Sequence, residues 1–146
     1  MVTNSQEKTM GRFSVEVELA NNLDIHLAQS GHLASDKVRR ARVRGVVDSG
    51  ATRLVLPETV ANLLGLTVSG RAGVRYADGR LAERNIVQDV HLSYGGRQSV
   101  FNAIVEPGRE SALIGAIVLE DLDFLIDCGA QKLVPRDPKQ IISEVE

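Results

Sequence analysis

Hydrophobic and polar residues alternate along the first part of the chain. From Gly11 onward every second residue is apolar, and polar residues such as Ser14 and Glu16 lie between them. Because the side chains of a β-strand point alternately to its two faces, this period of two predicts a half-buried strand. Its apolar face consists of Phe13, Val15, Val17 and Leu19.

The same alternation resumes after a polar pair. Asn21 and Asn22 are typical turn residues, and the apolar positions then recur at Leu23, Ile25 and Leu27. We therefore expect a second strand that forms a hairpin with the first. Residues 29–36 contain serine, glycine and aspartate, which predicts a connecting loop.

Residues 37–47 combine a basic run with alternating apolar positions. The arginines at 40, 42 and 44 alternate with Ala41 and Val43. We interpret the basic run as the solvated face of a strand rather than as a binding patch. The strand ends at the apolar pair Val46-Val47.

A short strand and a helix are expected next. Residues 52–56 are largely apolar, and Pro57 is well suited to the first position of a helix because its φ angle is already helical. Gly65 can end that helix. Its apolar face is predicted to consist of Val60, Leu63 and Leu64.

The middle of the chain, residues 67–105, carries strand and turn signals. Asp78-Gly79 lies between apolar residues and predicts one hairpin, and Gly95-Gly96 predicts a second. Pro107-Gly108 marks a further turn.

The end of the chain predicts one more helix and two more strands. Residues 116–122 show a short amphipathic pattern, and residues 124–126 and 132–134 are apolar enough for strands. All of these elements together predict a mostly β fold, a closed or sandwiched sheet with one or two short α-helices.

Composition narrows the possible partners. A chain of 146 residues with 43% hydrophobic residues fits one domain with one core. A net charge of −2, three Phe, two Tyr and no Trp argue against nucleic acid, which requires basic surfaces and stacking platforms. No apolar run reaches the ~18 residues that span a bilayer, so no membrane partner is expected. The single Cys128 and a polar start indicate a cytoplasmic protein.

The segment with the most informative chemistry directly follows Val46-Val47. Asp48-Ser49-Gly50-Ala51 places a carboxylate on a glycine turn at the end of a buried strand. The three histidines, His26, His32 and His91, show no metal-ligand spacing, and no phosphate-binding or dinucleotide motif is present. We therefore expect neither a metal nor another cofactor.

Three elements in order resemble the retropepsin-like aspartic proteases, the single-lobed family that includes the retroviral proteases. The first is Val46 to Thr52 with the aspartate turn, the second is the helix from Leu56 to Leu66, and the third is Ala112-Leu113-Ile114-Gly115, followed by a short helix and Asp123 to Asp127. The resemblance covers residues 11–135 and implies the family's closed, barrel-like fold.

The resemblance also implies roles for particular residues. Asp48 corresponds to the catalytic aspartate, and Ser49 to the hydroxyl residue that braces two catalytic loops against each other. The rest of the active-site loop is Gly50, Ala51 and Thr52, and Thr52 replaces the acidic residue of retroviral enzymes. The segment that threads past the aspartate corresponds to Leu113, Ile114 and Gly115. The flap that closes over substrate corresponds to Tyr76, Ala77, Asp78 and Gly79.

A second aspartate turn resembles the first. Leu125-Ile126-Asp127-Cys128-Gly129-Ala130 repeats the pattern of Val46 to Ala51. Only 19 residues follow Asp127, too few to build another helix, flap and threading segment around it. We therefore predict that Asp127 is structural and that the second catalytic carboxylate is Asp48 of another protomer.

The resulting hypothesis is a homodimeric aspartic endopeptidase, with residues 1–10 as a loose N-terminus, 11–136 as the protease domain and 137–146 as a C-terminal tail. Two Asp48 carboxylates would share one proton and activate water against a peptide bond. Two alternatives stay open. One is a catalytically inactive peptide-binding or dimerisation module of the same fold. The other is a protein that becomes a protease only after its N-terminus is trimmed.

Overall fold

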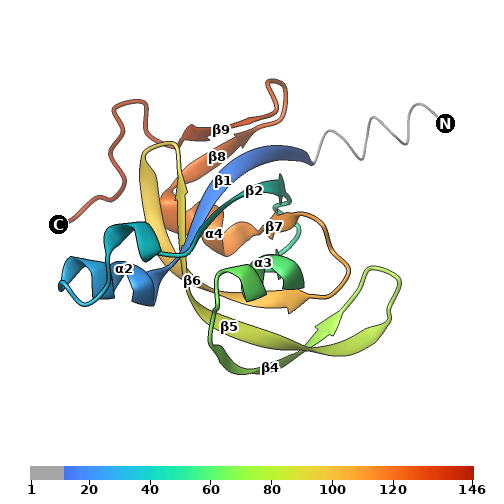
Figure 1. Ribbon diagram of the computed structural model, residues 1–146. Helices are drawn as coiled ribbons and strands as arrows, with labels where there is room; N and C mark the ends of the chain where they lie inside the picture. Colours follow the sequence, from blue (N-terminus) through green and yellow to red (C-terminus); the bar gives the residue numbers. More distant parts are fainter. Residues whose placement is uncertain (1–11) are drawn as a thin grey trace.

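The computed structural model describes residues 12–146, and the prediction of a loose terminus at residues 1–10 lies outside that range (Figure 1). Nine strands and three α-helices follow one another along these residues. In chain order they are β1 (Phe13–Asn21), α2 (Asn22–Gln29), the 3₁₀ turn η1 (Ser35–Lys37), β2 (Arg40–Val47), β3 (Leu54–Pro57), α3 (Glu58–Leu63), β4 (Val68–Arg75), β5 (Leu81–Tyr94), β6 (Arg97–Glu106), β7 (Ala112–Ile114), α4 (Ala116–Leu122), β8 (Phe124–Asp127) and β9 (Lys132–Pro135).

Seven of the strands form one sheet that closes on itself. Their order is β1-β2-β7-β3-β6-β5-β4, and β1 also pairs with β5. This additional pairing joins six strands into a ring and leaves β4 outside it, attached only to β5. The predicted mostly β, barrel-like fold is therefore confirmed.

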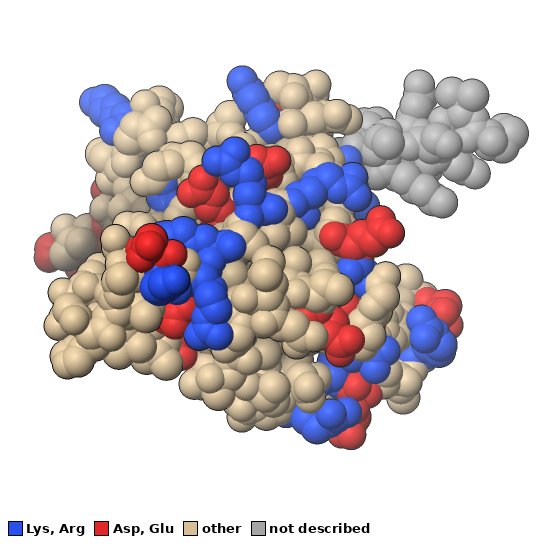
Figure 2. All heavy atoms as spheres, viewed as in Figure 1, with Lys and Arg blue, Asp and Glu red and all other residues tan. Residues whose placement is uncertain are grey.

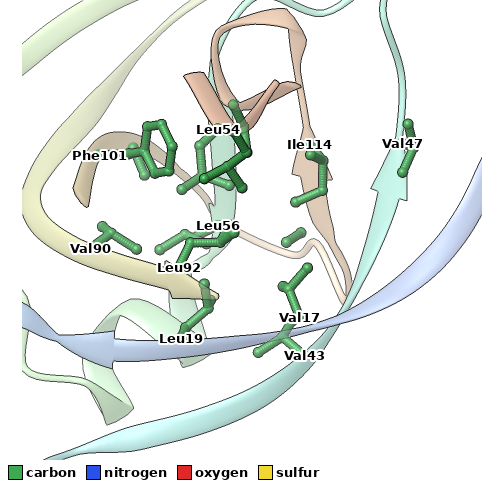
Figure 3. Packing of buried hydrophobic residues seen from close by; sticks show 14 of the residues in the cluster. Val17, Leu19, Val43, Val47, Leu54, Leu56, Val90, Leu92, Phe101 and Ile114 are labelled. Carbon is green, nitrogen blue, oxygen red and sulfur yellow. The ribbon is translucent and has the colours of Figure 1, made fainter. Parts of the chain in front are cut away.

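The interior of the ring is filled by apolar side chains from all six of its strands (Figure 3). The alternation predicted for the first strand is confirmed, since Val17 and Leu19 are buried while Ser14 and Glu18 are exposed. Transfer of these side chains from water drives the closure of the barrel. The most deeply buried members include Val47, Leu54, Leu56, Val90, Leu92 and Ile114.

The basic run lies on the outer face of β2, as expected. Arg42 forms ion pairs with Glu18 at 3.0 Å and with Glu16 at 3.3 Å, and these side chains are all more than half exposed. Basic and acidic side chains are interspersed over the face seen in Figure 2. The arginines at 40, 42 and 44 are therefore exposed, and Arg42 pairs with neighbouring acids.

The strand predicted at Leu23, Ile25 and Leu27 is wrong, because these residues belong to α2. Asn21 acts as the N-cap, and its side-chain oxygen accepts the backbone N–H of Asp24 at 3.1 Å. Arg39 then holds the buried Asp24 carboxylate through two side-chain hydrogen bonds, at 2.8 and 3.0 Å. Capping and this ion pair favour the helix over the short alternating pattern.

The helix after Pro57 is present, but one of its predicted core residues is not buried. Pro57 is the N-cap of α3, and Gly65 follows its end with φ of 60°. Leu64 and Ala61 are buried, whereas Leu63 is 63% exposed. The prediction for Leu63 was therefore wrong, because the face of α3 that meets the barrel is set by Ala61 and Leu64.

Several further predictions of local structure are confirmed. Asp78-Gly79 lies in the turn between β4 and β5, and Gly95-Gly96 lies between β5 and β6. Residues 116–122 form α4, and β8 pairs with β9 in a separate two-stranded sheet. Residues 137–146 contain no helix or strand. None of the helices in the described part of the chain is both long and apolar enough to cross a membrane.

Candidate active site

Asp48 lies at the end of β2, immediately after the fully buried Val47. Its side chain is 16% exposed, while Ser49 and Gly50, the next two residues, are exposed. The apolar core thus fixes the end of the strand, and the carboxylate emerges at the surface of the barrel.

The carboxylate is oriented by its own turn. The backbone N–H of Gly50 donates to Asp48 Oδ1 at 2.9 Å, and the N–H of Ala51 donates to the carbonyl oxygen of Asp48 at 3.1 Å. These two hydrogen bonds close the turn around the side chain and leave Oδ2 directed outward.

The segment of β7 and α4 holds the same turn from behind. β7 lies between β2 and β3, parallel to β2. The N–H of Asp48 donates to Ile114 O at 3.1 Å, and the first two N–H groups of α4, from Ala116 and Ile117, donate to Ala51 O and Thr52 O, each at 2.9 Å. The start of a helix leaves such N–H groups unpaired within the helix, so here they bind the aspartate loop instead.

Gly115 makes this close approach possible. A Cβ atom at this position would lie 2.6 Å from Arg53 O and 2.7 Å from the carbonyl carbon of Thr52. Both are backbone atoms, which cannot rotate out of the way. Leu113, Ile114 and Gly115, singled out from the sequence, therefore lie directly against the Asp48 loop, with Leu113 and Ile114 in β7.

The far end of α4 is also fixed. Arg97 Nη1 donates to Leu122 O at 2.7 Å and to Asp123 O at 2.8 Å. A guanidinium at a helix C-terminus satisfies the last carbonyl groups and favours the helix dipole. The helix that supports the Asp48 loop is thus anchored at both of its ends.

Sequence reasoning missed Arg12, which contacts the candidate catalytic group. Arg12 Nη2 lies 3.1 Å from Asp48 Oδ2, and the Arg12 side chain is 63% exposed. The residue lies just before β1, and Phe13 pairs with Val47 in the sheet. Strand pairing therefore brings Arg12 to Asp48, and no local sequence pattern around either residue indicates it.

The predicted flap residues lie in the turn of the β4–β5 hairpin, which projects beyond the six-stranded ring (Figure 1). The turn is closed by Tyr76 N–H to Arg80 O and by Gly79 N–H to Tyr76 O, both at 2.9 Å. Gly79 has φ of 87°, a value that favours glycine. Within residues 12–146 no hydrogen bond or ion pair joins this turn to the Asp48 loop.

The Tyr76 side chain is bound to the barrel wall. Its hydroxyl donates to the carboxylate of Glu106, 2.8 Å from each oxygen, and Arg84 Nε donates to Glu106 Oε1 at 2.9 Å. Desolvation, followed by the hydrogen bond and charge of Glu106, raises the pKa of Tyr76. Neither Glu106 nor Arg84 was singled out from the sequence.

Asp127 is the last residue of β8, directly before the turn that leads to β9, and its strand belongs to a sheet separate from that of the Asp48 loop. Its Oδ1 accepts the N–H of Ala130 at 3.0 Å, and Cys128 is exposed. For the described residues, no group of three or more His, Cys, Asp or Glu side chains gathers as a metal site would require.

The fold and the site together define a class of protein. A closed six-stranded ring with one aspartate turn, braced by a threaded strand and the helix after it, is the single lobe of a retropepsin-like protein. The aspartyl protease family matches residues 35–118, more than half of the chain, and the protein belongs to that family.

One solved structure of a viral protease shares the fold, and a second is similar at a lower score. EIAV protease in complex with the inhibitor HBY-793 is 18% identical, with 76% of this chain and 88% of that chain covered and a TM-score of 0.55. The protease of simian foamy virus (mac) is 14% identical over 73% of this chain and 91% of that chain, with a TM-score of 0.47. No curated protein matches this chain at a significant level.

Proposed function

We propose that this protein is an aspartic endopeptidase whose active site forms when two copies of the chain bring their Asp48 carboxylates together. The observation that carries the proposal is the rigid mounting of the Asp48 loop on β7 and α4. A general acid or base must be held in place to act efficiently, and this loop is held by backbone hydrogen bonds on both sides. The family match supports the same assignment.

The chemistry requires a second carboxylate. Two facing Asp48 side chains share one proton, because two carboxyl groups at short distance would repel each other if both were ionised. The ionised carboxylate takes a proton from water as the water oxygen attacks the peptide carbonyl carbon. The protonated carboxyl donates its proton to the carbonyl oxygen. The first carboxyl, now protonated, then donates its proton to the amide nitrogen while the second carboxylate takes a proton from a hydroxyl of the tetrahedral intermediate. The C–N bond breaks, the carboxylic acid and the amine leave, and the pair again shares one proton.

A homodimer follows from this mechanism. The described chain has one aspartate on a loop braced in this way, so the second must come from a two-fold related copy. The exposed Ser49 hydroxyl beside Asp48 supports a role as a brace between the two loops.

The substrate is proposed to be a peptide or protein in an extended conformation. An extended chain pairs readily with strand edges, and the turn from Tyr76 to Gly79 at the end of the β4–β5 hairpin is the proposed cover over it. Exclusion of nucleic acid and membrane as partners stays a prediction from composition, as does the cytoplasmic location.

The direct test uses a diverse peptide mixture incubated with the wild type and with Asp48→Asn. We expect cleavage by the wild type and none by the variant, which keeps the size and shape of the side chain. Equal elution volumes in size-exclusion chromatography would show that the variant still folds and associates. Cleavage that survives the change would refute the proposal.

A second candidate function is favoured by one contact. Arg12 forms an ion pair with Asp48 Oδ2, which is the contact expected of a structural carboxylate in an inactive binding or dimerisation module. Such a module would bind peptides without cleaving them. The test measures peptide binding by isothermal titration and then checks the same peptide by mass spectrometry. A peptide that binds and remains intact would favour this candidate over the protease.

A further inference from the structure

We propose that Tyr76, Arg84 and Glu106 form a flap latch that holds the β4–β5 hairpin in its working position, with Glu106 as a positioning residue. This inference rests on the proposed peptidase function. The three residues come from the hairpin turn, from β5 and from the end of β6, so the contact joins segments 22 to 30 residues apart in the chain.

The latch is a set of charge-assisted hydrogen bonds. The Tyr76 hydroxyl lies 2.8 Å from both oxygens of Glu106, and Arg84 Nε lies 2.9 Å from Oε1. The side chains of Arg84 and Glu106 are only 24% and 18% exposed. Hydrogen bonds to charged groups are stronger than neutral ones, and partial burial reduces their screening by water and salt.

The aromatic ring of Tyr76 is held as well as its hydroxyl. The guanidinium carbon of Arg80 lies 4.4 Å from the ring centroid, and that of Arg84 lies 5.8 Å from it. Arg80 is itself paired with Asp78 at 3.3 Å. Charged side chains of both signs gather over this hairpin, at the lower right of Figure 2. The Tyr76 side chain therefore contacts the guanidinium groups of Arg80 and Arg84 and the carboxylate of Glu106.

The hairpin needs such a contact because it has little else to hold it. From Leu81 to Asn85, β5 pairs only with β4, and its pairing with β6 begins at Ile86. An isolated two-stranded ribbon is marginally stable in water. Without the latch, the end of the hairpin would be free to move relative to the barrel.

Glu106 belongs to the barrel and binds the hairpin turn, so it can hold the flap in a fixed place relative to the barrel. It pairs with Pro57 at the end of β3, the strand that leaves the Asp48 loop at Leu54. The latch therefore fixes the flap relative to β3, the strand that directly follows the proposed catalytic loop. Because the Tyr76 hydroxyl is already engaged, we assign substrate contact in the flap to the backbone of residues 77–79.

The first experiment follows amide hydrogen exchange in the wild type, Tyr76→Phe, Glu106→Gln and the double variant. The reporters are the N–H groups of Tyr76 and Gly79, which close the turn. We expect both single variants to exchange about three- to tenfold faster there, because Tyr76→Phe removes the donor and Glu106→Gln removes the charge that strengthens the hydrogen bond. The double variant should exchange no faster than the faster single variant, because both changes act on one contact. This readout needs no enzymatic activity.

A matched control lies on the same hairpin. Arg71→Gln removes the hydrogen bond between Arg71 and Asn85, 2.9 Å, without touching the latch. Exchange at Tyr76 and Gly79 should then equal the wild type. Unchanged exchange in Tyr76→Phe and Glu106→Gln, or additive effects in the double variant, would overturn the latch.

The second experiment separates positioning from plain stability. On a peptide cleaved by the wild type, Tyr76→Phe and Glu106→Gln should raise KM about three- to tenfold with kcat within about twofold, since a loose flap weakens substrate binding. Faster exchange with unchanged kinetics would refute the positioning role. If the wild type cleaves nothing, the proposed function fails, and the exchange experiment still decides whether the latch exists.

Discussion

Two turns of this chain share the pattern of an aspartate, a small residue, glycine and alanine, and their surroundings differ. The Asp48 turn separates β2 from β3, and these strands are not neighbours, because β7 lies between them. Its backbone is bound by Ile114, Ala116 and Ile117. The turn is thus held by the barrel behind it, while the Asp48 side chain and the exposed Ser49 and Gly50 lie at the surface.

The Asp127 turn connects two strands that pair directly with each other. Asp127 lies opposite Lys132 in the β8–β9 sheet, which is separate from the seven-stranded sheet. Its carboxylate accepts a hydrogen bond from Ala130 within the same turn. Cys128, Gly129 and Ala130 are exposed. Here the aspartate closes a surface hairpin.

The difference shows that the residue pattern builds only the local turn. A catalytic role requires that the turn be held against a second element, and β7 with α4 provides this for Asp48. Matched substitutions in the two turns should therefore differ in their effects.

Replacement of the Asp48 or the Asp127 carboxylate by an amide should give the largest difference in activity between the two turns. Asp48→Asn should lower kcat/KM by about 10⁴-fold, the upper end of the usual contribution of a general acid or base, which leaves no cleavage detectable in a peptide mixture. Asp127→Asn keeps the oxygen that accepts from Ala130 and should stay within about twofold of the wild type. The measurement is kcat/KM on one cleaved peptide. Comparable losses in both variants would break the comparison.

Addition of one methyl group to a glycine tests the bracing. Gly115→Ala should destabilise the fold by about 1–3 kcal/mol and displace the Asp48 loop, because the new Cβ meets the backbone of Thr52 and Arg53. A displacement of this kind costs about 100-fold in activity. Urea unfolding and peptide cleavage measure the two effects.

Gly129→Ala is the matched control in the other turn. Its added Cβ would lie 3.6 Å from Asp127 Oδ1, an ordinary contact. We expect a change in the free energy of unfolding of less than about 0.5 kcal/mol. A larger cost at Gly129 than at Gly115 would show that the braced loop tolerates the methyl group and that the bracing argument is wrong.

Asp24 provides a purely structural aspartate for reference. The side-chain hydrogen bond from Arg39 is the main cause that lowers the pKa of Asp24 below its usual value of 3.8, against the opposing effect of burial. Asp24→Asn should cost about 1–3 kcal/mol in unfolding free energy at neutral pH. In contrast, Asp48→Asn should change the free energy of unfolding by less than about 1 kcal/mol.

The sign of the pH dependence follows from the direction of this shift. The folded-state pKa of Asp24 lies below the unfolded value, so its stabilising contribution is complete above 3.8 and is lost as the pH falls toward the folded-state pKa. Urea unfolding at a series of pH values should therefore show a shallower loss of stability in acid for Asp24→Asn than for the wild type. If the free energy of unfolding fell equally steeply with acid in both proteins, Asp24 would not contribute to the pH dependence.

The smallest effect concerns Arg12. Its guanidinium lies 3.1 Å from Asp48 Oδ2 and so occupies the side of the carboxylate that the proposed second carboxylate and water would approach. Arg12→Gln should therefore raise kcat/KM at neutral pH by about two- to fivefold, the range of an exposed ion pair. Arg42→Gln, which breaks an ion pair on the outer face of β2, is the control and should change nothing. A loss of activity in Arg12→Gln would instead assign Arg12 a supporting role.

Local structure was predictable wherever one strong signal acted alone. The alternation in β1, the glycine turns at Asp78-Gly79 and Gly95-Gly96, and the amphipathic run of α4 all appear where expected. The strand predicted at residues 23–27 failed because three alternating apolar residues are a weak signal. Asn21, followed three residues later by Asp24, resembles a helix-capping motif. This motif is the sequence signal for α2, and the alternation of apolar residues pointed to a strand instead.

Contacts between distant residues were not predictable in this way. Arg12 reaches Asp48 through the pairing of β1 with β2, and Tyr76 reaches Glu106 across 30 residues. Neither partner has a distinctive sequence around it, because an arginine or glutamate on a strand is ordinary surface composition. Only the path of the chain shows which of these charges meet.

The sequence by itself determined the strands, the glycine turns and the aspartate loop, since backbone preferences and alternation act within a few residues. Tertiary structure decided which aspartate is braced, where α2 forms and which side chains hold the β4–β5 hairpin. Those outcomes depend on close packing and hydrogen bonds between segments far apart in the chain. Asp48 and Asp127 therefore share a local pattern and differ in what lies behind it.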